Sequence, residues 1–162
     1  MKNTVIFKLA NIYYIVVSIY VIFYYTLSFF SSFKTLPVKL IVFDLIIIFL
    51  FLFLLVTNYL LLRNKDLILF LFDFNIYFSL FQIINIQLPY FKYNFTSGIE
   101  FEPFIALYKN LEFGLGVKLI RTIFDFNIYQ GIEGFYIGLN IIPIVLFFIY
   151  KKAKNKIILK KV

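Results

Sequence analysis

Long apolar runs separated by short polar breaks dominate the pattern of this sequence. A helix needs roughly 20 mainly apolar residues to cross the hydrocarbon core of a bilayer. Four runs are expected to do so, at 11–31, 40–62, 67–88 and 135–150. The pattern therefore predicts an all-α membrane protein with four transmembrane helices.

The segment 89–134, between the third and fourth expected spans, has a different pattern in which apolar and polar residues alternate. Alternation over 91–96 and again over 99–102 predicts a β-hairpin with its loop at 96–98. Pro103 is expected to end that ladder, because proline cannot donate a backbone hydrogen bond. A small antiparallel β segment is thus predicted between helices three and four.

Two further strands are expected in this segment, at 111–119 and at 124–129. Together with the hairpin they would share one apolar face. Such a face requires a cover, which we expect to be the helices, the lipid headgroup region or another subunit.

The hexapeptide FDFNIY occurs at 72–77 and again at 124–129. The flanks of the two copies share no similarity, so the string is not evidence of a duplication. The first copy lies in an expected span and the second in the alternating segment. We therefore predict a helix for the first and a strand for the second.

Polar side chains inside the expected spans are the candidate functional residues. Asp44 lies in the second span and Asp73 in the third, and a central Asp costs roughly 2.5–3.5 kcal/mol on insertion scales. The third span also carries a polar stripe at spacings of four, three and three, formed by Asn75, Ser79, Gln82 and Asn85. The stripe is expected to face other helices, either as part of a proton or solute path or as hydrogen-bonding contacts, and we favour contacts.

The two aspartates enter antiparallel spans from opposite ends, so helix rise separates Asp44 and Asp73 by about 15 Å in depth. An intramembrane aspartyl enzyme needs two carboxylates at one depth. That class is therefore disfavoured.

Composition supports a membrane protein and removes most catalytic chemistry. The chain of 162 residues is 63% hydrophobic, with 24 Phe and 13 Tyr. Soluble domains contain roughly 45–50% apolar residues. Cys, His and Trp do not occur in the sequence, so thiol, imidazole and the usual zinc or haem chemistry are excluded. No catalytic residues, metal ligands or cofactors are expected, and whether the chain belongs to an enzyme stays open.

The net charge of +8 comes largely from the tail at 151–162, which directly follows an apolar run. The tail contributes six of the 16 basic residues, namely Lys151, Lys152, Lys154, Lys156, Lys160 and Lys161. A topology signal explains this charge better than nucleic-acid binding does. With four spans, both termini would lie on the basic side of the membrane and the β segment on the other side.

Residues 127–135, NIYQGIEGF, run into an apolar helix, and this stretch resembles the entry to a helix of antiporter-like subunits of respiratory NADH:quinone oxidoreductase. The family has a Gly-apolar-Asp-Gly turn there, and Glu133 stands in the place of its Asp. The resemblance covers about residues 120–145. The Lys and Glu residues that transfer protons in that family lie on later helices, so none is carried over.

Codon usage forced toward A and T would explain the Phe-, Ile-, Asn- and Lys-rich composition. We therefore expect a mainly structural membrane subunit of a mitochondrial respiratory-chain complex, in the inner membrane with both termini in the matrix. Its partners would be the lipid bilayer and other membrane subunits. The alternative is a bacterial inner-membrane protein of transporter, immunity or envelope-assembly type, with cytoplasmic termini and a path lined by Asp73 and the stripe.

Overall fold

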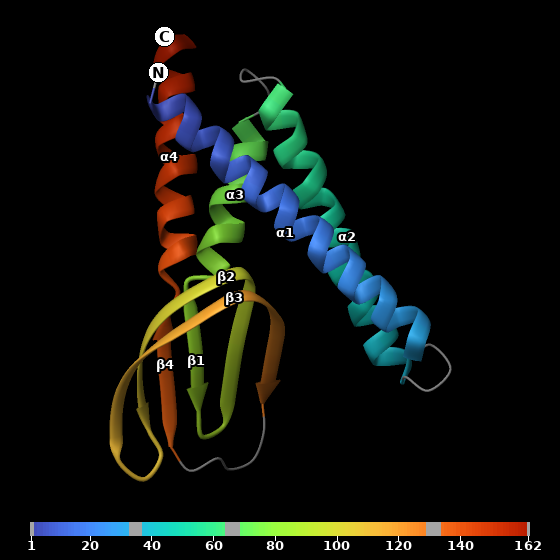
Figure 1. Ribbon diagram of the computed structural model, residues 1–162, viewed down its shortest axis with the longest axis vertical. Helices are drawn as coiled ribbons and strands as arrows, with labels where there is room; N and C mark the ends of the chain where they lie inside the picture. Colours follow the sequence, from blue (N-terminus) through green and yellow to red (C-terminus); the bar gives the residue numbers. More distant parts are fainter. Residues whose placement is uncertain (1, 33–36, 64–68, 129–133, 162) are drawn as a thin grey trace. The chain divides into compact units, whose positions relative to one another are not determined.

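The computed structural model describes residues 2–32, 37–63, 69–128 and 134–161, which form four helices and four strands (Figure 1). The chain divides into two compact units. We call Met1–Leu71 the helical unit and Phe72–Val162 the sheet unit, and each is described by itself.

The helical unit consists mainly of α1 (Lys2–Ser32) and α2 (Val38–Arg63), which pack against each other. Within them, Val5–Ser31 with 27 residues and Leu40–Arg63 with 24 residues are long and apolar enough to cross a membrane. At 1.5 Å per residue both exceed the roughly 30 Å of a hydrocarbon core. Large apolar side chains are exposed along both helices, as expected for a lipid-facing surface.

Two buried asparagines in these helices bond to their own backbone. The Asn11 amide donates to the carbonyl oxygen of Phe7 at 2.7 Å, and the Asn58 amide donates to that of Leu54 at 2.8 Å. Both side chains are fully buried. These bonds to the preceding turn satisfy polar groups without water, which an apolar environment requires.

Helix α3 (Leu69–Phe81) belongs to the sheet unit from Phe72 onward. The sheet unit also contains α4 (Ile141–Lys161) and one antiparallel sheet with the strand order β1-β4-β2-β3. Its strands are β1 (Ile84–Leu88), β2 (Phe91–Leu107), β3 (Leu111–Ile128) and β4 (Phe135–Leu139). The first part of β2 pairs with β1, its last part pairs with β4, and β4 pairs with β1. The three strands therefore close a ring, and β2 must coil strongly to reach both partners (Figure 1).

Both helices of the sheet unit leave the same end of the sheet (Figure 1). The reason is the pairing of Ile84, where β1 begins after α3, with Leu139, where β4 ends before α4. The next residue, Asn140, donates its backbone N–H to the carbonyl oxygen of Ile83 at 2.7 Å. The pairing of β1 with β4 thus fixes where α3 ends and where α4 begins.

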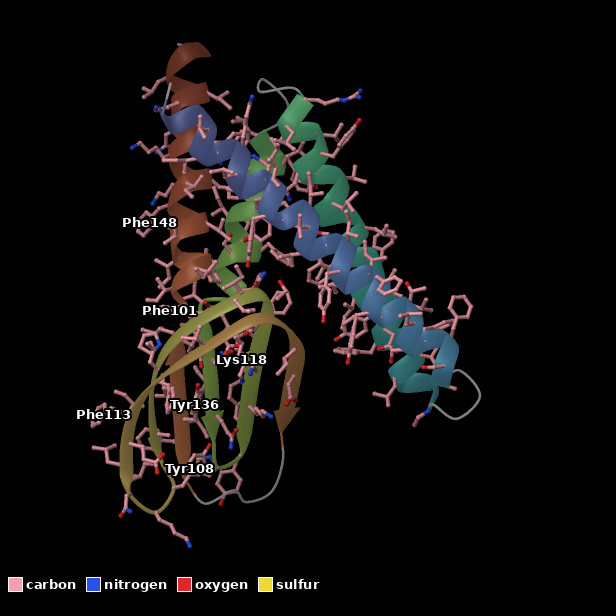
Figure 2. All side chains as sticks on the ribbon, viewed as in Figure 1. Phe101, Tyr108, Phe113, Lys118, Tyr136 and Phe148 are labelled. Atoms are coloured by element: carbon pink, nitrogen blue, oxygen red, sulfur yellow. The ribbon has the colours of Figure 1, made fainter. Side chains whose placement is uncertain are left out.

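The sheet has polar side chains on its inner face and apolar side chains on its outer face. Glu100 and Glu102 on β2 are buried, whereas Phe113 on β3 is 70% exposed and Leu119 is 78% exposed. Figure 2 shows Phe113 projecting away from the sheet. The apolar face expected from the sequence is therefore present, and it points outward.

The prediction of an all-α protein with four membrane spans is wrong. The third expected span, 67–88, contains a helix of only 13 residues, because Ile84–Leu88 forms β1. The fourth, 135–150, begins with strand β4, and α4 starts only at Ile141. An apolar run of this length can complete a helix or a strand, and here pairing between β1 and β4 selects the strand.

The predicted hairpin loop at 96–98 is also wrong. Strand β2 continues through these residues, because β3 supplies partners on both sides of them. Gly98 does adopt a positive φ of 89°, but it accompanies an irregularity in the β2–β3 register. Pro103 does not end the ladder either, since it lies opposite Leu115. The observed turns are at 89–90 and 108–110.

The two copies of FDFNIY adopt different structures, as predicted. The first lies entirely within α3. The second lies in β3 as far as Ile128, and its last residue is outside the described part of the chain. The strand expected at 111–119 is likewise confirmed as part of β3.

Candidate functional site

The predicted polar stripe is buried in the sheet unit, but it does not lie on one helix. Asn75 and Ser79 are on α3, Gln82 is in the turn after it, and Asn85 is on β1; each is at most 2% exposed. The Ser79 hydroxyl donates to the carbonyl oxygen of Asn75 at 2.8 Å. The stripe therefore continues from the helix into the interior of the sheet.

Gln82 connects the turn after α3 to the middle of β2. Its side-chain oxygen accepts hydrogen bonds from the backbone N–H of Ser97 at 3.2 Å and from the Ser97 hydroxyl at 3.0 Å. This contact supports the interpretation of the stripe as a set of hydrogen-bonding contacts. The same contact ties Ser97, in the middle of the 96–98 segment, to the end of α3.

Three side chains, one from each strand of the ring, meet at a buried carboxylate, and we call them the Glu102 cluster. Glu102 on β2 accepts hydrogen bonds from the amide of Asn85 on β1 and from the hydroxyl of Tyr136 on β4. Glu102 is fully buried, and a carboxylate in such a place requires hydrogen-bond donors. The cluster therefore holds the ring together from the inside.

Gly138 on β4 makes room for this cluster. A Cβ atom at this position would overlap the side chain of Glu102. Gly138 is also paired on both sides, with Asn85 on β1 and with Phe104 on β2, so the strand cannot move away easily.

Asn140 begins α4 and also contacts the sheet. Its side-chain oxygen accepts hydrogen bonds from the backbone N–H groups of Ile142 and Phe101, each at 3.3 Å. The first of these bonds caps the helix, because the opening N–H groups of a helix have no partner within it.

A cavity of about 300 Å³ lies against the inner face of the sheet and is lined by residues of all four strands. In its wall, Lys92 and Asp125 form an ion pair with an N–O distance of 2.5 Å. The Tyr93 hydroxyl donates to the carbonyl oxygen of Phe81 at 2.5 Å, and burial raises the pKa of this phenol. The wall thus contains charged and polar groups in fixed positions.

The two aspartates predicted as functional residues lie in different units. Asp44 is half-buried on α2 of the helical unit. Asp73 on α3 pairs with Lys154 on α4 of the sheet unit, with an N–O distance of 2.5 Å. The sequence predicts that Lys154 belongs to a basic tail that signals topology, whereas in the structure α4 continues through this tail to Lys161.

Sequence reasoning missed Glu102, Tyr136 and Lys154 as partners of the residues it identified. A signal for Glu102 existed, because the alternation over 99–102 placed it on a polar face. No local signal pairs residues 17 or 34 positions apart, as in the contacts of Glu102 with Asn85 and Tyr136.

We expect the Asp73–Lys154 pair to contribute little to stability in detergent solution. The two side chains are 35% and 24% exposed, and pairs of this kind contribute about 0.2–1 kcal/mol. A double-mutant cycle with Asp73→Asn and Lys154→Met, followed by thermal unfolding, measures this coupling. A coupling well above that range would favour a functional role for Asp73 in a less polar environment.

Within the described residues, no group of three or more His, Cys, Asp or Glu side chains is arranged to hold a metal ion. No protein-family model, curated protein or solved structure matches this chain.

Proposed function

We propose that this chain is an integral membrane protein that serves as a mainly structural subunit of a larger membrane assembly. The observation that supports this most strongly is the polarity of the sheet, with polar groups inside and apolar groups outside. In water such a face is unfavourable by roughly 25 cal/mol for each Å² of apolar surface. A sheet of this kind therefore needs an apolar environment.

The helical unit supports the same proposal. Its two long apolar helices expose side chains such as Phe23, Phe30 and Phe49, at 63%, 75% and 73%. The buried amides of Asn11 and Asn58 donate to backbone carbonyls of the preceding turn. The helical unit is thus suited to contact with lipid.

The free edge of β3 favours a protein partner for the sheet over lipid alone. Among the described residues, β3 (Leu111–Ile128) pairs only with β2, so the backbone groups along its other edge have no strand partner. Open sheet edges do not occur against hydrocarbon, because each unsatisfied group costs several kcal/mol. A strand or loop of another subunit would satisfy this edge and cover the outer face.

The compartment belongs to the same proposal. The A- and T-biased composition and the short resemblance at about 120–145 favour a respiratory-chain complex of the mitochondrial inner membrane. A bacterial inner membrane is the alternative. The test is separation of mitochondrial or bacterial membranes by density, followed by detection of a tagged copy of the chain.

Blue-native electrophoresis in mild detergent tests the assembly. We expect the wild-type chain to migrate in a complex well above its own mass of 19.4 kDa. We expect Val117→Lys, which places a charge on the outer face at a residue that is 59% exposed, to release the chain from this complex. The physical reason is that an unpaired charge in an apolar interface costs several kcal/mol.

Asn110→Lys is the matched control, because it adds the same charge at the exposed turn between β2 and β3, next to the outer face but not on it. This variant is expected to remain in the complex. Migration of the wild-type chain as a free monomer, or equal behaviour of the two variants, would contradict the proposal.

A further inference from the structure

We propose that the cavity in the sheet unit is a binding site for a small molecule that carries an anionic oxygen group, a carboxylate or a phosphate. The cavity of about 300 Å³ is at the lower end of the range for small-molecule sites, roughly 300–1,000 Å³. This inference is independent of the proposed assembly. It concerns the inner face of the sheet, whereas the assembly concerns the outer face.

The polar inner face is not explained by folding alone. A sheet gains stability by burying apolar side chains, whereas buried polar groups cost free energy unless all of them are hydrogen-bonded. The inner face nevertheless holds two buried glutamates, at 100 and 102, and the cavity beside them is lined by further charged side chains. A cavity with a small number of polar groups in fixed positions is a common property of binding sites.

Most charged groups in the cavity wall already have partners within the fold. Lys92 is paired with Asp125. Glu102 is held by Asn85 and Tyr136. These contacts make the wall rigid, and rigid walls favour binding because little side-chain entropy is lost when a ligand enters.

Lys118 on β3 is the exception. It lines the cavity, and the described part of the chain gives its ammonium group neither an ion pair nor a hydrogen bond. Figure 2 shows Lys118 in the sheet, on β3, the strand that pairs with β2. Its side chain is exposed, so a ligand can reach it from outside. An unpaired ammonium group attracts an anionic oxygen.

Neutral donors complete the wall. Gln87 on β1 and Tyr108 at the turn after β2 line the same cavity, and no hydrogen bond within the described residues uses either side chain. An amide N–H and a phenolic O–H can both donate to an oxygen anion. Lys118 is therefore the group that would contact the anionic oxygen, while Gln87 and Tyr108 offer neutral donors elsewhere along the cavity wall.

The anion could belong to a soluble compound or to a lipid headgroup, and the experiment separates the two. The purified full-length chain is unfolded thermally in detergent, with circular dichroism as the readout because the sequence contains no Trp. The soluble probes are acetate, inorganic phosphate and glycerol phosphate at millimolar concentration, with chloride keeping the ionic strength constant. The lipid probe is phosphatidic acid in nanodiscs, compared with phosphatidylcholine.

We expect at least one anionic probe to raise Tm, since a ligand that binds only the folded state stabilises it. We expect Lys118→Gln to weaken the binding by about tenfold or more, because it removes a charge-assisted hydrogen bond. Lys118→Arg should retain binding. Lys109→Gln, which removes an equivalent charge from the exposed turn outside the cavity, should have no effect.

If a soluble probe raises Tm, the ligand is a soluble anion. If only phosphatidic acid raises Tm, the ligand is a lipid headgroup. The proposal is overturned if no probe raises Tm. It is also overturned if Lys118→Gln and Lys109→Gln respond to the probes in the same way, since binding would then be a general effect of surface charge.

Discussion

Gly138→Ala is expected to lower the free energy of unfolding of the sheet unit by about 2–4 kcal/mol. The added methyl group would overlap the side chain of Glu102. Glu102 cannot turn aside freely, because Asn85 and Tyr136 hold its carboxylate. The variant must therefore break these bonds or displace β4, and thermal unfolding in detergent measures the loss.

Gly116→Ala is the matched control, because Gly116 also lies on the sheet, opposite Glu102. A Cβ atom there would have its nearest neighbour, the backbone oxygen of Glu102, at 3.6 Å, which is an ordinary contact. We expect this variant to be neutral or slightly stabilising, since alanine restricts the unfolded chain more than glycine does. Equal destabilisation by the two substitutions would show that Gly138 has no special steric role.

Removing the buried carboxylate should have an effect of similar size. We expect Glu102→Ala to destabilise the sheet unit by about 3 kcal/mol, because a buried donor that loses its acceptor costs about 1–3 kcal/mol. Two donors are affected here, the amide of Asn85 and the hydroxyl of Tyr136. The measurement is again the thermal unfolding midpoint, with the secondary structure of the folded variant checked by circular dichroism.

Glu102→Gln is expected to cost much less, because the amide oxygen can still accept from Asn85 while the Tyr136 hydroxyl can rotate to accept from the amide nitrogen. The double substitution Glu102→Ala with Tyr136→Phe should be less destabilising than the sum of its parts, since it removes both ends of one hydrogen bond. If Glu102→Gln is as harmful as Glu102→Ala, the negative charge itself stabilises the fold. If neither variant is harmful, the Glu102 cluster does not hold the ring together.

Part of the fold could be predicted because the relevant signals are local. The apolar runs of α1 and α2 are long enough to form membrane-spanning helices without any knowledge of their neighbours. Alternation at 111–119 likewise marks a strand, because its apolar side chains fall on one face. The polar stripe was visible as a set of polar residues in an apolar run, but only Asn75 and Ser79 lie on the predicted helix.

The prediction of the third and fourth membrane spans is wrong because hydropathy reports the composition of a segment and not the strand it pairs with. Residues 84–88 and 135–139 are apolar enough to extend a helix, yet they pair with each other across the sheet. The hairpin at 96–98 failed because a local search for a turn cannot include a partner such as β3, which continues opposite all three residues. In both cases the deciding hydrogen bonds join residues that are distant in sequence.

The two copies of FDFNIY have the same local sequence but different surroundings. Sequence alone placed the first copy in an apolar run and the second in an alternating segment, and the structure has a helix and a strand there. The aspartate of each copy forms an ion pair at 2.5 Å, Asp73 with Lys154 and Asp125 with Lys92. A partner of opposite charge lowers the free-energy cost of a carboxylate in such half-buried surroundings. Only the fold decided which lysine each aspartate meets, because the ring of β1, β2 and β4 sets where α3 ends, where α4 begins and where β3 runs.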